Sequence, residues 1–138
     1  MRMYKSSFLI IMVLIITSCG GGSLIKPGIG SIVIDGLIIN NGTEKPVYDF
    51  LLKIEKIKEI LSVSPILARA SFTTKFPLRK YKGNRVSLTW KHDGRNWKSK
   101  NIIINPPKGL AAGRSVTVVI TISDYGQFNT NMIHSDNL

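Results

Sequence analysis

The sequence of 138 residues holds one cysteine, Cys19, and this thiol is the group best suited to covalent chemistry. It follows nine consecutive apolar residues, 8–16, and the small residues Thr17 and Ser18. Three glycines and Ser23 come directly after it, and a segment so rich in glycine cannot pack a thiol into a core. Because a thiolate is a nucleophile, we interpret Cys19 as an attachment point rather than a redox, metal or catalytic group.

The residues before this thiol have the three parts of a secretory signal peptide. Arg2 and Lys5 give a positive start, an apolar stretch follows, and small residues end it. The apolar run is shorter than the ~20 residues that a membrane-spanning helix needs. The stretch ITSC, residues 16–19, resembles the lipobox of bacterial lipoproteins, with isoleucine where leucine is usual.

This resemblance covers residues 1–19 only, and it implies cleavage before Cys19 and acylation of the new N-terminus. Two or more acyl chains then anchor the protein durably to a membrane. Gly20 stands where lipoproteins that stay in the inner membrane often carry Asp, which favours the periplasmic face of the outer membrane. In a host with one membrane, the anchor implies the outer face of the plasma membrane. An ordinary signal peptide or short membrane anchor with an incidental cysteine is the alternative.

Apart from this thiol, no group of residues has the spacing of a catalytic or metal site. The two histidines, His92 and His134, have no cluster of cysteines or carboxylates near them in sequence, and no serine has a G-x-S-x-G setting. We interpret His92 beside Asp93 as turn chemistry. Glu55 and Glu59 lie among lysines, where ion pairs are expected instead of acid–base catalysis. We therefore predict that the protein is not an enzyme and uses no cofactor and no metal.

The chain is strongly basic, with 19 Lys and Arg against eight Asp and Glu and a net charge of +11. Loss of residues 1–18 removes two of the cations and leaves 17 against eight, a net charge of +9. Residues 75–100 hold nine cations and one acid, Asp93, and so carry +8 of this excess. This predicts a face that binds an anionic partner: lipid head groups, lipopolysaccharide, an acidic wall polymer or an acidic envelope protein. A solvated sheet face, whose lysines keep an edge soluble, is the simpler alternative.

Seven residues of this window are the candidate contacts, and the aromatic one is expected to pack against a ligand. They are Lys80, Tyr81, Lys82, Arg85, Lys91, Lys98 and Lys100. Nucleic acid is another common partner of basic patches, but the export signal argues against it.

Short segments rich in β-branched residues, separated by turn signals, follow the signal sequence. The glycine-rich residues 19–30 are expected to form a flexible tether between lipid and domain, and the eleven residues after the cysteine span at most ~36 Å. A bulge is expected at Gly36 and a strand end at Pro77. The expected strands are residues 31–40, 70–76, 85–91, 96–104 and 114–123. Residues 125–138 are polar and rich in asparagine, and we expect a loose tail.

Residues 47–63 fit two structures. Their apolar residues recur at helical spacing, and residues 50–55 equally alternate as in a strand. The pattern alone favours a helix. Because the segments on both sides are expected strands, we favour a strand through about Lys56 and hold the helix open.

The pair Asp93-Gly94 is a strong signal for a two-residue hairpin turn, and it fixes a register. His92 then faces Arg95, Lys91 faces Asn96, Trp90 faces Trp97, Thr89 faces Lys98 and Ser87 faces Lys100. One face carries Val86, Leu88, Trp90 and Trp97 and is expected in the core. The other carries Arg85, Ser87, Thr89, Lys91, Asn96, Lys98 and Lys100, without a carboxylate. A strict register would turn Ile102 outward, so a bulge is expected near residues 99–101.

These segments together predict an all-β protein, a small antiparallel, immunoglobulin-like β-sandwich. The expected organisation is a signal peptide (1–18), a lipidated cysteine and tether (19–30), the sandwich (31–124) and a tail (125–138). We expect a lipoprotein whose basic domain binds a partner, as an adaptor of an envelope assembly. A surface exclusion or immunity lipoprotein, acting against a toxin or phage protein, is the alternative.

Overall fold

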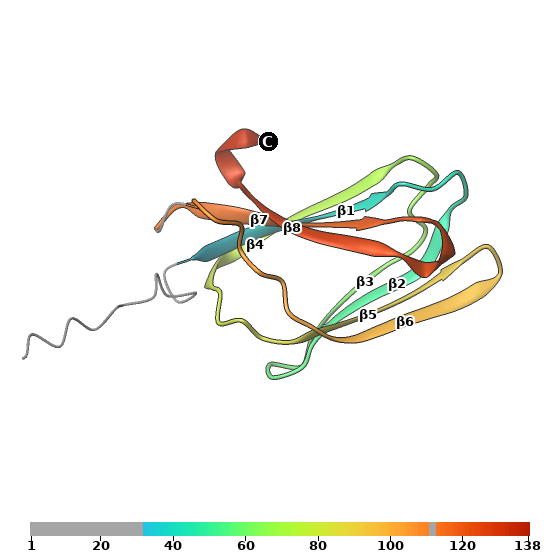
Figure 1. The fold of residues 1–138 in the computed structure, drawn as a ribbon, viewed down its shortest axis with the longest axis horizontal. Coiled ribbons are helices and arrows are strands. Elements are labelled where there is room, and N and C mark those ends of the chain that lie inside the picture. Colours follow the sequence, from blue (N-terminus) through green and yellow to red (C-terminus); the bar gives the residue numbers. More distant parts are fainter. Residues whose placement is uncertain (1–31, 111–112) are drawn as a thin grey trace, which may run out of the picture.

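The computed structural model describes residues 32–110 and 113–138, and these form a sandwich of two four-stranded sheets (Figure 1). Sheet A has the strand order β4–β1–β7–β8 and sheet B has the order β3–β2–β5–β6. The strands are β1 (Val33–Asn41), β2 (Val47–Ile54), β3 (Glu59–Val63), β4 (Ser71–Lys80), β5 (Val86–His92), β6 (Arg95–Ile102), β7 (Ser115–Ile122) and β8 (Phe128–His134). Two short 3₁₀ turns, η2 (Asp124–Gly126) and η3 (Ser135–Asn137), flank β8. The predicted β-sandwich is confirmed.

The core lies between the sheets and comes from alternate residues of the strands, as a half-buried strand requires. Ile39 of β1, Phe50 of β2 and Leu88 of β5 are fully buried, and so is Ile120 of β7. The core residues that the structure describes all lie between Ile32 and Met132. A chain of residues 24–138 therefore contains this whole core.

In sheet A the two central strands, β1 and β7, run parallel, whereas every other pairing is antiparallel. The register of β1 shifts between Ile34 and Gly36, so the bulge predicted at Gly36 is confirmed. A Cβ atom at Gly36 would lie 3.2 Å from Thr117 Oγ1 and 3.3 Å from the Thr74 carbonyl oxygen. Glycine thus allows β1 to lie close to its neighbours at the bulge.

The ambiguous segment 47–63 forms two antiparallel strands, β2 and β3, which pair from Phe50–Val63 to Ile54–Glu59. The strand is therefore confirmed there and the helix is wrong. The tight turn between them places Lys58 at a φ of 51°. Because this turn is short, apolar residues of β2 and β3 lie close together in the sequence and recur at helical spacing. This explains why the sequence was ambiguous.

Strand β4 does not end at Pro77, contrary to the sequence prediction, but continues to Lys80. β4 is an edge strand that pairs only with β1. Pro77 lies between Lys75, which pairs with Gly36, and Arg79, which pairs with Ile34, so it is in an irregular stretch where three residues of β4 face one of β1. Proline is tolerated at such a place because no ladder hydrogen bond is lost there.

The loose tail expected over residues 125–138 is wrong, since Phe128–His134 forms β8 on the edge of sheet A. Met132 is 1% exposed, and Phe128 packs edge-on against Trp90 with ring centroids 5.9 Å apart. The asparagines at 129 and 131 are exposed and alternate with these inward residues. Their polarity concealed a strand pattern of period two. The sandwich therefore extends beyond the expected boundary at residue 124.

The β5–β6 hairpin has the predicted register, with Trp90 opposite Trp97 and Thr89 opposite Lys98. The bulge expected near residues 99–101 is also present. The register shifts between Val86 and Leu88, and Asn101 has a φ of 57°. This bulge lets Ile102 pack against the core.

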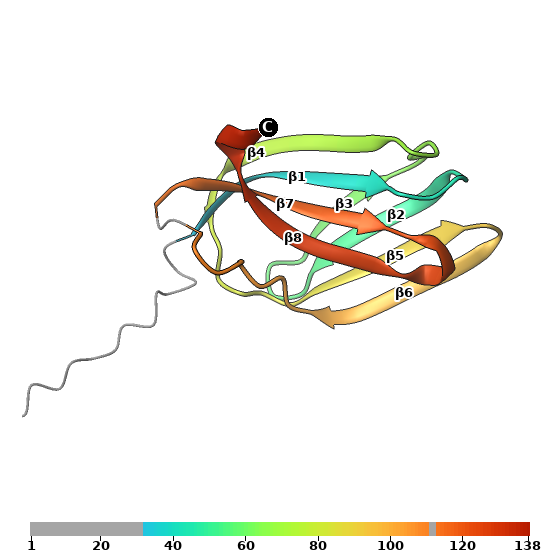
Figure 2. The ribbon, with the colours of Figure 1, turned by 45° about the horizontal axis from the view of Figure 1, so that its top comes forward.

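The two ends of the sandwich differ in what they carry (Figures 1 and 2). The start of β1 and the end of β4 lie at one end, where the Tyr81 amide donates a hydrogen bond of 2.8 Å to the Ile32 carbonyl. The β5–β6 turn lies at the opposite end. Within residues 32–110 and 113–138, no helix has the length and apolar character needed to cross a membrane. The predicted signal peptide, lipidated Cys19 and tether (1–30) lie outside the described residues.

Candidate functional site: a basic sheet face and an inter-sheet pocket

The structure divides the predicted contact residues into two groups. Lys91, Lys98 and Lys100 lie on β5 and β6, and all three are exposed. Lys80 and Lys82 are also exposed but line a pocket at the end of the sandwich where β1 begins. Exposed Arg85 precedes β5. The predicted cluster is therefore not a single surface.

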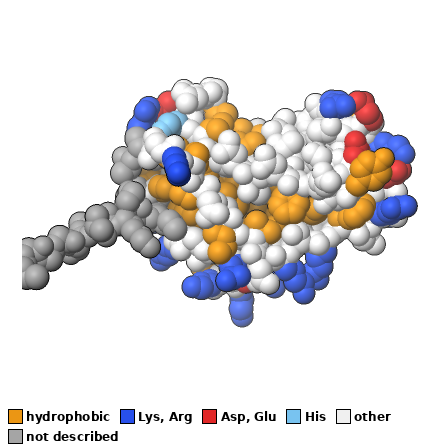
Figure 3. Space-filling model, in the orientation of Figure 1, with side chains coloured by type: hydrophobic (Ala, Val, Ile, Leu, Met, Phe, Trp, Pro, Cys, Tyr) orange, Lys and Arg blue, Asp and Glu red, His pale blue; other side chains and the backbone are white. Residues whose placement is uncertain are grey.

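The first group belongs to the outer face of sheet B, which we call the basic face. Strand pairing places Lys53 of β2 beside Ser87, and Tyr48 beside Lys91. Thr89 lies between Leu51 of β2 and Lys98 of β6. The basic face consists of Tyr48, Leu51, Lys53, Ile60, Ser62, Ser87, Thr89, Lys91, Asn96, Lys98 and Lys100. Figure 3 shows Lys and Arg side chains along the lower edge of the molecule, where sheet B lies.

The basic face carries four lysines, and the acid nearest to them on these strands is Asp49 of β2, which lines a hollow with Tyr48 and Lys91. Adjacent strands lie ~4.8 Å apart, so lysines on β2 and β6 stand about 10 Å apart across the sheet. The nearby acids, Asp49 and Asp93, lie toward the end that carries the hairpin turn. Asp93 already pairs with Lys45 at 2.5 Å, and this hydrogen bond holds the pKa of the carboxyl below its usual value. None of the ion pairs among the described residues includes a lysine of the face.

Tyr81 does not have the exposed position that its predicted role requires. It is 9% exposed, and its hydroxyl donates a hydrogen bond to the Ile104 carbonyl. Burial raises the pKa of this hydroxyl. Tyr81 therefore belongs to the core and cannot pack against a ligand on the basic face, although it also lines the pocket.

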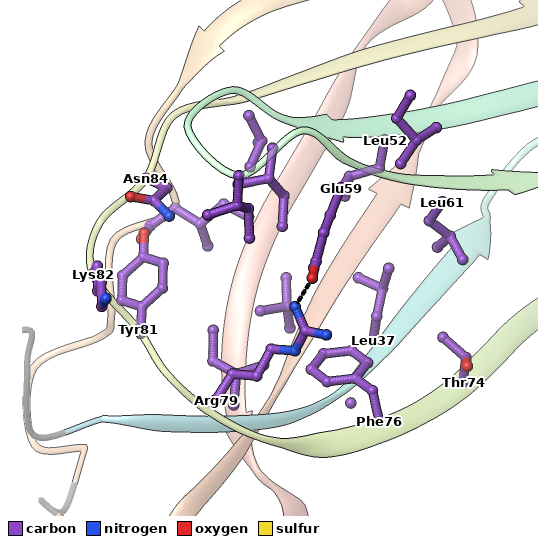
Figure 4. Close-up of a pocket in the computed structure, with 18 of the residues that line it drawn as sticks. Leu37, Leu52, Glu59, Leu61, Thr74, Phe76, Arg79, Tyr81, Lys82 and Asn84 are labelled. Atoms are coloured by element: carbon purple, nitrogen blue, oxygen red, sulfur yellow. Dashed lines mark hydrogen bonds and ion pairs between the residues drawn. The ribbon is translucent and has the colours of Figure 1, made fainter.

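The pocket has a volume of about 390 Å³ and opens between the edge strands of the two sheets, β3 and β4. Its apolar lining includes Leu37 of β1, Leu52 of β2, Leu61 of β3 and Phe76 of β4. Figure 4 shows Arg79 of β4 reaching toward Glu59 of β3, where the two side chains form an ion pair. The remaining lining residues are Ile34, Gly36, Ile54, Ile57, Ile60, Thr74, Lys80, Tyr81, Lys82, Asn84, Val86, Ile104 and Val118.

The residues best suited to acid–base or metal chemistry lie apart from one another. Within residues 32–110 and 113–138, no three side chains of His, Cys, Asp or Glu gather as a metal site would require. His92 is the last residue of β5, where it pairs with Arg95 across the Asp93-Gly94 turn and is 5% exposed. The expected ion pairing of Glu59 is confirmed, although its partner is Arg79 of β4 rather than a neighbouring lysine.

Sequence reasoning missed two parts of these sites. Lys53 and Tyr48 join the basic face only if residues 47–54 form a strand beside β5, and that segment was ambiguous. A period-two count outward from buried Phe50 and Leu52 would have placed Lys53 on the solvent side. The pocket has no local sequence signal, because its lining comes from strands that are far apart in the chain.

Comparisons with known proteins add little to this geometry. No family model and no curated protein matches the chain. Among solved structures, the chain is similar to one described as an NMR structure of a protein from Eubacterium rectale, with 10% sequence identity and a TM-score of 0.43. The match covers 73% of this chain and 87% of that one. A similarity at this level carries no functional information.

Proposed function

We propose that this protein is a lipid-anchored, non-catalytic binding protein whose basic face holds anionic head groups at the surface of the cell envelope. The observation that carries the proposal is the outer face of sheet B, where Lys53, Lys91, Lys98 and Lys100 are exposed and belong to none of the ion pairs among the described residues. The anchor rests on the resemblance of residues 16–19 to a lipobox.

The chemistry of the face suits a surface of many anions better than one small ligand. Each basic residue near an anionic membrane contributes about 1 kcal/mol, so four lysines acting together bind appreciably although each alone is weak. Ser62, Ser87 and Thr89 supply hydroxyl donors between the lysines. Tyr48, which is 45% exposed, offers a ring of the kind that settles at a membrane interface.

The experiment is flotation of residues 24–138 with vesicles of neutral phosphatidylcholine, or of phosphatidylcholine mixed with phosphatidylglycerol. The amide NMR spectrum of this chain first establishes that it is folded. We expect binding to the anionic vesicles only. We also expect its loss at 1 M salt, where the Debye length is about 3 Å.

The matched variants carry the same change of charge on different surfaces. The first replaces the four lysines of the face by Gln: Lys53→Gln, Lys91→Gln, Lys98→Gln and Lys100→Gln. The second replaces four exposed lysines elsewhere by Gln: Lys56→Gln, Lys58→Gln, Lys75→Gln and Lys108→Gln. Loss of binding in the first variant alone supports the proposal. Equal loss in both means attraction by net charge, and no binding of the unmodified chain means that the face is merely solvated; either result refutes it.

A further inference from the structure

We infer that the pocket between the sheets is a second binding site, which takes one alkyl chain of an amphiphile with an anionic head group, such as a fatty acid or a lysophospholipid. Its volume of about 390 Å³ lies within the range of ligand pockets, and its lining is mostly apolar with a few polar groups, as such pockets require. Nothing in the proposed role of the basic face uses this cavity.

The interior of the pocket suits an alkyl chain. Leu37, Leu52, Leu61 and Phe76 present aliphatic and aromatic surface from both sheets, with no buried charge among them (Figure 4). Most of these side chains are buried or half-buried. An alkyl chain placed between them would supply the van der Waals contacts that these side chains lack while the pocket is empty.

The charged residues at the mouth of the pocket favour a head group with a negative charge. Arg79, Lys80 and Lys82 lie among its lining residues, against one acid, Glu59. Arg79 and Glu59 pair across the gap between β4 and β3, and their side chains remain 47% and 44% exposed. A carboxylate or phosphate at the mouth would meet Lys80 and Lys82 and could share the Arg79 guanidinium, whereas a cationic head group would be repelled.

The lip of the pocket and its place in the fold favour the same ligand. Ile57 and Ile60 line the pocket and are 48% and 59% exposed, so apolar surface continues from the interior to the solvent. The lining includes Ile34, Lys80 and Tyr81, at the end where β1 begins and where the Tyr81 amide bonds to the Ile32 carbonyl. The chain leading to the predicted anchor therefore enters the sandwich beside the mouth, which would hold the mouth close to a source of alkyl chains.

The test measures binding of three molecules with the same twelve-carbon chain to residues 24–138: dodecanoate, dodecanol and dodecylammonium. This chain lacks Cys19, so any lipid attached there cannot compete. Titration calorimetry gives the affinities, and amide NMR shifts locate the ligand. We expect dodecanoate to bind with about tenfold higher affinity than dodecylammonium, and dodecanol to lie between them. We expect the shifts to fall on residues of β3, β4 and the β4–β5 segment.

Two pairs of variants give the inference its controls. Leu61→Trp fills the pocket, and Leu67→Trp adds the same bulk at a residue that is 61% exposed and outside the pocket. Arg79→Gln removes a cation at the mouth, and Arg114→Gln removes one from the similarly exposed pair with Asp136. We expect Leu61→Trp to weaken binding of all three molecules about tenfold and Arg79→Gln to weaken dodecanoate alone, with both controls unchanged.

Several outcomes would overturn the inference. The first is a set of amide NMR shifts on residues outside the pocket. The second is equal affinity for dodecanoate and dodecylammonium, and the third is undiminished binding by the Leu61→Trp variant. If Leu61→Trp fails to fold, Leu61→Phe makes a smaller change of the same kind, and Arg79→Gln tests the mouth without touching the core. A lysophospholipid in place of dodecanoate then distinguishes a phosphate head group from a carboxylate.

Discussion

At the scale of single residues, Asn41 shows how a buried polar side chain can fix a turn. It is 2% exposed, and its amide nitrogen donates to the carbonyls of Lys45, Ile66 and Leu67 at 2.9, 3.1 and 3.0 Å. Its amide oxygen accepts hydrogen bonds from the backbone and hydroxyl of Thr43. One side chain thus holds the loop after β1 to the loop after β3.

We therefore expect Asn41→Ala to reduce the free energy of unfolding by about 2–3 kcal/mol, because it removes these hydrogen bonds and leaves the buried amide of Thr43 without its acceptor. Urea unfolding of residues 24–138 measures this. The control is Asn129→Ala, at an exposed position of β8, which should change stability by less than about 0.5 kcal/mol. Equal effects of the two substitutions would show that the network around Asn41 adds nothing.

Tyr81 gives a prediction about pH. Burial raises the pKa of its hydroxyl in the folded state, whereas a tyrosine in the unfolded chain ionises near pH ~10. The unfolded state therefore loses its proton first, and the contribution of Tyr81 to stability is present below pH ~10 and declines as the pH rises further.

Tyr81→Phe should make the decline in stability between pH 9 and pH 11 less steep. At pH 7 it should cost about 1 kcal/mol, for the hydrogen bond to Ile104. Unfolding curves of both chains at each pH measure the difference. Parallel declines would mean that Tyr81 ionises equally readily in the folded protein.

At the scale of elements, the turn η2 positions strand β8, which the sequence did not predict, against the β5–β6 hairpin. A Cβ atom at Gly126 would lie 2.0 Å from Cε3 of Trp97, so the indole rests directly on the backbone of this glycine. Gly126 also has a φ of +71°, in the left-handed region that disfavours other residues. Close packing and backbone conformation both require glycine here.

Gly94 offers the control that separates these two reasons. Its φ is +72°, but nothing lies within 4 Å of a Cβ placed on it. We expect Gly94→Ala to cost about 1 kcal/mol from conformation alone. Gly126→Ala should cost about 1–3 kcal/mol more, because the indole of Trp97 must move. Urea unfolding compares the two variants, and Trp fluorescence should change only in the second. Equal costs would show that Trp97 yields without penalty.

The elements also show what the sequence could predict. The β5–β6 hairpin was predictable to its register and its bulge, because Asp93-Gly94 fixes the pairing locally. Strand β8 was not predicted, since Asn129 and Asn131 on its outer side concealed the alternation of Phe128 and Met132. The end of β4 was wrong because Pro77 is accommodated by an irregular pairing with β1, which is distant in sequence. The basic face was half predictable: its lysines on the hairpin followed from alternation, but Lys53 needed the pairing of β2 with β5.

At the scale of the whole molecule, the predicted anchor decides where the sandwich would act. If Cys19 carries lipid, a bacterial host grown with alkyne-tagged palmitate should label the full chain. Cys19→Ser should abolish the label and release the protein from the membrane fraction. The quadruple Gln variant of the basic face should keep its label, because its change lies in the folded domain. Labelling of the Cys19→Ser chain would exclude the lipobox interpretation.

The basic face and the pocket lie on different surfaces of one sandwich, which leads to a prediction about their independence. The face is the outer side of sheet B, and the pocket lies between the sheets, so none of the four lysines of the face lines it. We expect the quadruple Gln variant to lose its binding to anionic vesicles but to bind dodecanoate with unchanged affinity. Leu61→Trp should bind dodecanoate about tenfold more weakly and retain its binding to the vesicles.

The chain that carries both sets of changes should bind both ligands weakly, with effects that add, because the residues changed at one site do not belong to the other and only Ile60 belongs to both sites. Flotation and calorimetry on the same preparations measure this. If Leu61→Trp also abolished vesicle binding, membrane association would depend on insertion of an alkyl chain into the pocket, and the two sites would be one. If the Gln variant lost dodecanoate, the lysines of the face would attract the ligand from a distance. High salt would then reduce dodecanoate binding in the unmodified chain far more than in the variant.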